Sequence, residues 1–424
     1  MSTDVASVVP EVVTAPAGTY WTRARKAGVT YIVLGLMAAL FWGVLAKHGG
    51  DSRFTLSTTY TGTAVPIPAR AGAIVCGLIA AAAGVALLSR LGRRFGLFSG
   101  IAVVGIVLSF LCWQVSGNVL PIGSTIALSV VAAIPLILGS LSGVLCERSG
   151  VINVAIEGQF LAGAFLGALA GTIAHSAWVG LIAGILGGVL ISALLAVLSI
   201  RYLVDQVVLG VLLNLLALGM TSFLYSQLMQ NDATSFNTPP LLPTWAIPGL
   251  SKIPVIGPTL FDGTILLYLA IVLVFVIHVA LFHTRWGLRT RAVGEHPVAA
   301  DTVGIKVRAI RYRNVLLAGV VAGLGGCYFT IGSTGSFGKN MTVGTGFIAL
   351  AALIFGRWSP IGATLAALLF GFSQALADVL GAINSSIPTE FVTMLPYLVT
   401  ILAVAGFVGR AKAPAADGKP YIKG

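Results

Sequence analysis

Three polar side chains interrupt a long apolar region in the stretch GVINVAIEGQF, residues 150–160: Asn153, Glu157 and Gln159. An acid at the centre of a membrane helix costs roughly 2.5 to 3.5 kcal/mol on insertion scales, and a buried amide without a partner is also costly. Such groups are tolerated where they line a path for a polar solute or where hydrogen bonds join them to other helices. Both roles stay open for Glu157, the second as a bridge to Arg148 or to backbone amides of an internal repeat.

The composition is that of a polytopic membrane protein. Of the 424 residues, 57% are hydrophobic and only 9% are charged, whereas about one quarter of an ordinary soluble chain is charged. We expect an all-α fold of about 12 transmembrane helices, with roughly 10 to 12 as the range. The apolar spans lie near 28–46, 72–89, 96–113, 124–145, 155–174, 177–199, 204–225, 264–283, 314–332, 344–356, 359–379 and 393–409. Span 344–356 is short, so it is either a half-helix or a helix that begins earlier.

The basic residues orient the chain. With a cytoplasmic N-terminus, the inner segments hold all but five of the 25 Lys and Arg residues. The outer segments then hold Lys47, Arg53, Arg70, Lys252 and Lys339. The positive-inside rule therefore predicts that both termini are cytoplasmic, and it attributes the net charge of +12 to topology and not to nucleic acid. A signal peptide is the alternative for the first span, but no A-x-A cleavage site follows it, which favours a retained helix.

No catalytic or metal site is predicted. The four cysteines lie in or beside apolar runs without CxxC spacing, and the five histidines show no metal-ligand spacing. The segment GSTGSFGKN, residues 332–340, lacks the GxxxxGK[ST] spacing of a P-loop and has Asn340 where Ser or Thr would hold magnesium. Membrane enzyme is therefore a poor hypothesis for this chain.

A weak internal repeat relates two glycine-punctuated segments. GVINVAIEGQFLAGAFLGAL, from Gly150, aligns without gaps on GKNMTVGTGFIALAALIFGR, from Gly338, which also pairs Gly158 with Gly346. In the predicted topology the first copy runs outward and the second runs inward. Inverted repeats of this kind place a substrate path at the interface between the copies. Similar composition of two Gly/Ala-rich helices is the simpler explanation of the match.

The largest cytoplasmic loop, residues 284–313, carries seven basic residues around a mild centre, GEHPVAADTVGI. Pro297 suits the first turn of a short helix, and Gly304 suits its C-terminal stop. The flanking bases suit the cytoplasmic lipid surface, and the Ala-rich centre suits a cleft of another protein. An ordinary basic loop is the alternative.

Three separated motifs carry a family resemblance. They are CERSG followed by GVINVAIEGQF, the loop GLRTRAVGEHPVAADTVGI, and the run GTGFIALAALIFGRWSPIGA. Together they resemble the permease subunits of ABC importers, in the group that includes ribose and branched-chain amino-acid permeases, and most of all its nucleoside branch. The resemblance covers about residues 125–410.

The resemblance implies a domain organisation and a set of partners. Residues 1–27 are a cytoplasmic tail, 28–120 are extra N-terminal helices, 121–410 are the permease core, and 411–424 are a second cytoplasmic tail. The expected partners are a cytoplasmic ABC ATPase, a second and homologous permease subunit, an extracytoplasmic solute-binding protein that meets loops 226–262 and 380–392, and lipid. The chain itself needs no cofactor, because ATP and magnesium bind the ATPase. The resemblance also places the chain in the cytoplasmic membrane of a prokaryote.

The resemblance also assigns residues. The coupling helix, which sits in a groove of the ATPase, corresponds to Gly294, Glu295, Pro297, Ala300, Asp301 and Gly304. A nucleoside is neutral and has a flat base, so its path needs amides and aromatic faces. The candidates for that path are Asn153, Glu157, Gln159, Phe160, Asn214, Phe347 and Gln374.

Two other transport functions stay open. A simple sugar such as ribose differs from a nucleoside only by the base, and no single residue here reads a base. An ion-coupled secondary transporter would use intramembrane carboxylates, for which Glu157, Asp205 and Asp378 are the candidates.

Overall fold

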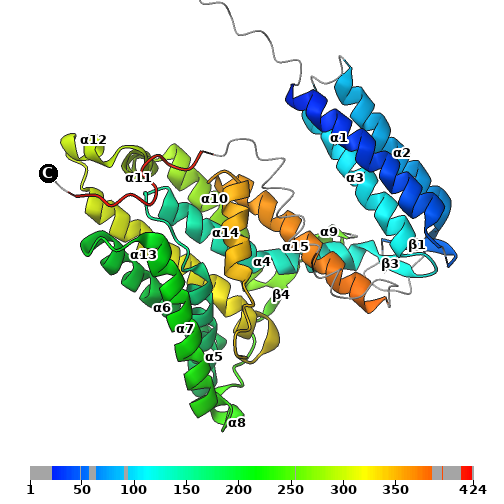
Figure 1. The fold of residues 1–424 in the computed structure, drawn as a ribbon. Helices are drawn as coiled ribbons and strands as arrows, with labels where there is room; N and C mark the ends of the chain where they lie inside the picture. Colours follow the sequence, from blue (N-terminus) through cyan, green and yellow to red (C-terminus); the bar gives the residue numbers. More distant parts are fainter. Residues whose placement is uncertain are drawn as a thin grey trace, which may run out of the picture. The chain divides into compact units, whose positions relative to one another are not determined.

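The computed structural model describes residues 22–47, 49–56, 64–89, 94–253, 255–383, 394 and 412–422, and most of them are helical (Figure 1). The chain forms two compact units. One consists of Met1–Phe54 and Val65–Val119, and the other of Thr55–Ala64 and Leu120–Gly424.

The N-terminal unit is built on three long helices (Figure 1). They are α1 (Arg23–Ala38), which continues as a π-helical turn over Ala39–Leu45, α2 (Ala69–Leu88) and α3 (Phe95–Gln114). Helices α1 and α2 touch at paired glycines, since a Cβ on Gly35 would lie 2.7 Å from the carbonyl oxygen of Gly77. Short strands β1 (Asp51–Thr55), β2 (Ala64–Pro68) and β3 (Val119–Pro121) form a sheet in the order β2-β1-β3.

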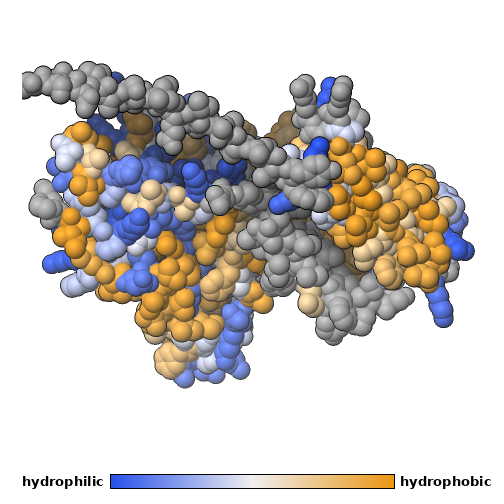
Figure 2. Space-filling model, turned by 45° about the horizontal axis from the view of Figure 1, so that its top comes forward, coloured by the Kyte–Doolittle hydropathy of each residue, from blue (hydrophilic) through white to orange (hydrophobic). Residues whose placement is uncertain are grey.

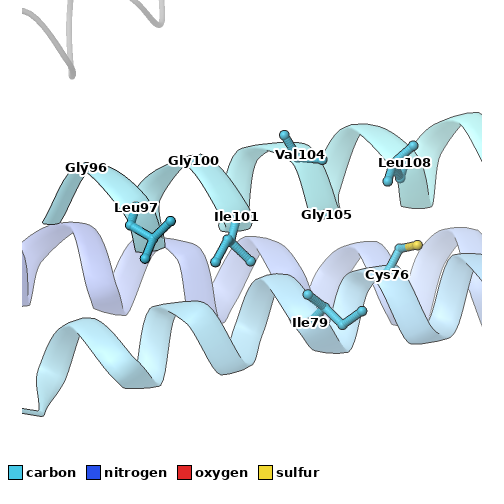
Figure 3. A pocket seen from close by; sticks show the side chains of 9 residues that line it. All are labelled: Cys76, Ile79, Gly96, Leu97, Gly100, Ile101, Val104, Gly105 and Leu108. Carbon is cyan, nitrogen blue, oxygen red and sulfur yellow. The ribbon is translucent and has the colours of Figure 1, made fainter. Parts of the chain in front are cut away.

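An apolar groove of about 450 Å³ runs between α2 and α3 (Figure 3). Gly96 and Gly100 leave it open, and Leu97, Ile101 and Leu108 are among the side chains that line it. Its lining offers a polar solute no hydrogen-bonding side chain apart from the thiol of Cys76. In Figure 2 the visible surface over these helices is a broad hydrophobic patch with hydrophilic residues at its edge, as lipid contact requires.

Among its described residues, the second unit holds seven helices long and apolar enough to cross a membrane and the shorter apolar helix α14. They are α4 (Ile122–Glu147), α5 (Ile156–Ile173), α6 (Ala177–Ala196), α7 (Gln206–Leu224), α10 (Ile265–His283), α13 (Val307–Phe329), α14 (Thr345–Phe355) and α15 (Pro360–Ala382). Helices α4, α5 and α13 are mostly buried inside the unit, whereas α7 and α10 keep wide apolar surfaces exposed. Close contacts between glycines bring α5, α6 and α13 together: a Cβ on Gly188 would lie 2.4 Å from the carbonyl oxygen of Gly319.

Short elements connect these helices. They are α8 (Ala233–Phe236), β4 (Thr244–Ala246), a 3₁₀ turn at Leu250–Lys252, α9 (Ile256–Leu260), β5 (Asp262–Thr264), α11 (Arg285–Glu295) and α12 (Pro297–Thr302). Strands β4 and β5 pair antiparallel, with Trp245 opposite Gly263.

The predicted spans agree well with the described helices. In the part of the chain that the structure describes, ten helices are long and apolar enough to cross a membrane, and each coincides with a predicted span. Span 344–356 is the short helix α14, so it does not begin earlier. Span 314–332 was placed too late, because α13 already begins at Val307 and so includes three arginines that were assigned to the loop. The predicted span 393–409 lies outside the described residues, except for Met394.

Candidate functional site

The α4–α5 loop, residues 148–155, is non-helical backbone between two buried membrane helices. Buried backbone groups must find hydrogen-bond partners within the protein. The N–H of Ile152 donates to Oε1 of Gln206 over 2.7 Å, and the carbonyl of Val154 accepts from Nδ2 of Asn214 over 2.9 Å. Oδ1 of Asn214 also accepts from the N–H of Gly158 over 2.8 Å. Helix α7 therefore holds the loop and the start of α5 with two side-chain amides.

The amides of Asn153 and Gln159 are fully buried and bind each other. Each side chain donates to the other's oxygen over 3.2 Å. Gln159 also donates to the hydroxyl of Ser192 over 2.8 Å, and Asn153 donates to the hydroxyl of Ser142 over 3.3 Å. These two predicted path residues therefore form one hydrogen-bonded layer that ties α4, α5 and α6 together.

Glu157 joins the two aligned copies directly. Its side chain is only 5% exposed. Oε1 accepts from the hydroxyl of Thr342 and, over 2.8 Å, from the N–H of Gly344, and Oε2 accepts from the N–H of Gly346 over 2.6 Å. The carboxylate thus satisfies unpaired N–H groups at the N-terminus of α14, where the helix dipole favours negative charge. This is the bridge to backbone amides of the repeat that the sequence left open.

Gly346 is where α14 comes closest to α5. A Cβ built on Gly346 would lie 2.5 Å from the backbone nitrogen of Glu157 and 2.7 Å from its Cα. Real Cβ atoms do not approach backbone this closely, so one of the helices would have to move.

We expect Gly346→Ala to lower the thermal stability of the detergent-solubilised chain, because the added methyl group pushes α14 away from the Glu157 carboxylate. Gly219→Ala on α7 is the matched control, since a Cβ there meets nothing within 4 Å. Equal thermal melts for the two variants would show that this contact does not stabilise the chain.

The other predicted path residues lie apart from this layer. Phe160 is fully buried against Phe329, with ring centroids 5.9 Å apart. Phe347, on the first turn of α14, is 48% exposed. Gln374 is half-buried on α15, and its amide donates to Asp378 over 3.1 Å.

The predicted coupling segment is a pair of short helices. Helix α11 begins after Thr284, whose hydroxyl accepts from the N–H of Gly287 over 3.2 Å. Helix α12 begins at Pro297, and Gly304 follows it with φ +82°. The expected short helix between Pro297 and Gly304 is therefore confirmed. Val298 and Val303 are 67% and 75% exposed, so this segment presents apolar side chains to its surroundings.

This segment contacts the α4–α5 loop. A Cβ on Gly294 would lie 2.3 Å from the carbonyl oxygen of Arg148, so only glycine fits there. Nε of Arg148 donates to the carbonyl of Trp358 over 2.8 Å, and Nε1 of Trp358 donates to Glu147 over 2.5 Å. Burial lowers the pKa of Arg148, and Arg291 adds to this while Glu295 opposes it. The coupling segment, the first copy and the end of the second copy thus meet at Arg148.

Comparison with known proteins decides the family. A family model described as "Branched-chain amino acid transport system / permease component" matches residues 125–404. The chain belongs to this permease family. The match begins in α4, so the permease carries helices α1–α3 in addition to the matched region. With ten apolar helices of spanning length among its described residues, the permease is a multi-pass protein of the cytoplasmic membrane of a prokaryote.

Three relatives are informative. The guanosine ABC transporter permease protein NupQ of Bacillus subtilis is 44% identical over 305 residues, which cover 70% of this chain and 95% of NupQ. The nucleoside ABC transporter permease protein NupC of Lactococcus lactis is 43% identical over 70% of this chain and 96% of NupC. The putative glucose ABC transporter permease protein TsgC13 of Haloferax volcanii is 33% identical over 67% of this chain and 92% of its own. No solved structure gives a significant match.

Several residues of the permease site were not predicted. Ser142, Ser192, Gln206 and Thr342 supply the partners of the buried polar layer and of Glu157. Each is a polar residue in or beside an apolar span, which is the signal that identified Asn153. Residues 412–422 belong to the predicted cytoplasmic tail 411–424, and no sequence signal indicated that they fold against the coupling segment.

Proposed function

We propose that the permease is the membrane subunit of an ATP-driven importer that moves nucleosides across the cytoplasmic membrane, with both termini on the cytoplasmic side. The observation that carries this proposal is the similarity, over 95% or more of their lengths, to NupQ and NupC, whose names state guanosine and nucleosides. A simple sugar is the second candidate, because TsgC13, named as a putative glucose permease, is 33% identical.

The seven candidate path residues divide into two groups in this proposal. The first group contains Asn153, Glu157, Gln159 and Asn214. Their side-chain amides and carboxylate are already hydrogen-bonded to other groups of the protein. They position the two repeats, together with the buried ring of Phe160. Direct contact with the solute falls to Phe347 and Gln374, which are not fully buried and offer an aromatic face and an amide.

The energy for transport would come from ATP hydrolysis in a partner protein. A cytoplasmic ABC ATPase would bind ATP and magnesium and dock against α12 and its neighbours, where Val298 and Val303 are exposed. A second, homologous permease subunit would complete the path, and a solute-binding protein would deliver the solute outside. The two repeats would rock about their contact at Glu157 and Gly346. Only a difference in affinity of the ATPase for the two conformations drives such a motion.

Val298→Asp and Val303→Asp test this function. We expect both variants to insert normally into the membrane but to lose the ATPase from the purified complex, because each places a charge in an apolar contact. Uptake of radiolabelled guanosine is expected to fall by a factor of about ten or more. Val298→Ala is the control and is expected to retain most of the uptake. A panel of nucleosides, ribose and glucose identifies the solute.

Two results would contradict the proposal. If the complex took up glucose or ribose but no nucleoside, the proposed solute would be wrong, whereas the ATP-driven mechanism would stand. Uptake that ignores an ATPase unable to hydrolyse ATP, and that collapses with a proton uncoupler, would indicate an ion-coupled secondary transporter.

A further inference from the structure

The C-terminal segment, residues 412–422, folds onto the coupling segment. In Figure 1 it is the red chain that runs beside α11 toward α12. The N–H of Ala416 donates to the carbonyl of Gly294 over 2.9 Å, and the N–H of Ala415 donates to Glu295 over 3.1 Å. The backbone and the acid at the end of α11 are therefore bound by the end of the chain, about 120 residues later in the sequence.

An apolar contact strengthens this docking. Tyr421 is buried in a small core with Val293 of α11, Ala300 of α12, and Val307 and Ile310 of α13. The carboxylate of Asp301 faces the hydroxyl of Tyr421. The ring thus fills the space beneath α12, and without it these aliphatic side chains would face water.

Arg311 connects the same segment to the transport core. It is the largest fully buried side chain of the described residues, with 2% exposure. Its Nε donates to the carbonyl of Ser149 over 3.2 Å, and its Nη1 donates to the carbonyl of Lys419 over 2.9 Å. The fit is tight, because a Cβ on Gly150 would lie 2.8 Å from Nη2 of Arg311 and 3.0 Å from the carbonyl oxygen of Ala416.

Two acidic residues from different parts of the chain lie close to Arg311. The charge of Asp417 in the C-terminal segment acts on Arg311, and Asp417 lies beside Glu147 at the end of α4. Glu147 in turn accepts from the indole of Trp358, which follows α14. A continuous set of contacts therefore runs from α11 and α12, through the C-terminal segment, to the α4–α5 loop and to the second repeat.

We propose that the C-terminal segment is a clasp that locks the coupling segment to the α4–α5 loop, so that movement imposed on α12 reaches both repeats. Arg311, Asp417 and Tyr421 are the positioning residues of this clasp. The inference rests on the proposed ATPase partner, but it concerns how this chain transmits the movement. A coupling segment tied to the bundle moves with it, whereas an untied segment can open locally and absorb the movement.

The test compares uptake with ATP hydrolysis in the reconstituted complex of permeases and ATPase. The variants are a chain that ends at Ala411, Tyr421→Ala and Asp417→Ala. We expect the complex to assemble and to hydrolyse ATP, while guanosine uptake per ATP hydrolysed falls about tenfold. Lys412→Ala, at an exposed position of the segment, is the control and is expected to match wild type. An unchanged ratio in the truncated chain would overturn the clasp.

A second measurement keeps the proposal testable if the truncated chain fails to assemble. Tyr421 is buried and is followed by Ile422, so chymotrypsin can cleave after Tyr421 only when the clasp opens. We expect slow cleavage at this bond in the wild-type complex and at least roughly tenfold faster cleavage in Asp417→Ala. Equal cleavage rates would contradict a docked segment. If wild type transports no nucleoside with the ATPase, the proposed function fails, whereas normal transport with no effect of these variants refutes the clasp alone.

Discussion

Glu157→Ala is expected to abolish transport, with less than about one hundredth of wild-type uptake remaining, and to destabilise the membrane domain by several kcal/mol. The substitution leaves the Thr342 hydroxyl and the N–H groups of Gly344 and Gly346 without their acceptor. Each buried donor left unpaired costs about 1 to 3 kcal/mol. The cost is high in the bundle because its interior has a low dielectric constant and water has little access to take the place of the lost acceptor.

The conservative variants separate a positioning role from a role in an ion path. In Glu157→Gln, the remaining oxygen still accepts from Thr342 and Gly344, but its NH₂ group faces the N–H of Gly346, and two donors repel. We therefore expect Glu157→Gln to fall between wild type and Glu157→Ala in both uptake and thermal stability. Asp262→Ala, which removes an exposed carboxylate, is the control for loss of charge.

A different order would contradict this account. If Glu157→Gln lost all uptake but melted at the wild-type temperature, the negative charge itself would be needed for transport. Glu157 would then be a group that titrates or binds a cation during the cycle, as in a secondary transporter, and not a cap of α14.

The membrane helices could be predicted from the sequence because hydropathy alone sets them. A helix satisfies its own backbone, so an apolar run of sufficient length needs no distant partner to be recognised. The start of α13 was placed seven residues late for a related reason. Arg308, Arg311 and Arg313 read as loop residues by the positive-inside rule, yet α13 includes them, and Arg311 is buried only because carbonyl groups of residues 149 and 419 surround it.

The polar site could be located from the sequence, but the hydrogen-bond partners of its residues could not be predicted. Asn153, Glu157 and Gln159 stand out because an apolar region rejects unpaired polar groups, and that argument needs no structure. Their partners are separated from them by up to 189 residues, as for Glu157 and Gly346. Which of two roles a buried carboxylate plays depends on those partners, so the aligned glycines of the repeat were the only sequence signal that these segments meet.

Arg311→Ala is the second variant for which a large effect is expected. It removes the cation that sits between the C-terminal segment and the α4–α5 loop, and it leaves Asp417 and Glu147 facing each other. It also leaves the carbonyl groups of Ser149 and Lys419 without their donor, and a buried polar group left unpaired costs about 1 to 3 kcal/mol. We expect release of the C-terminal segment, seen as rapid chymotryptic cleavage after Tyr421, and loss of uptake.

The cost of Arg311→Ala depends on pH, because the carboxyl of Asp417 titrates at a different pH in the docked and released segments. Burial raises the pKa of its carboxyl to about 7, although the Gly418 N–H, Glu147 and Arg311 each lower it. A released segment has an ordinary carboxyl with a pKa of about 3.9. The docked state therefore holds a proton that the released state lacks, so docking weakens as the pH rises from about 4 to about 7 and levels off above that.

Loss of Arg311 raises the docked pKa of Asp417 further, because one of the groups that lowers it is gone. The penalty of Arg311→Ala is consequently expected to be smallest near about pH 5, where the carboxyl is neutral in the docked variant, and to grow toward about pH 8. Asp417→Asn in the Arg311→Ala background removes the titrating group and should flatten the profile. Thermal melts at the two pH values measure this. A penalty independent of pH would mean that Arg311 acts through its carbonyl partners alone, since these do not titrate.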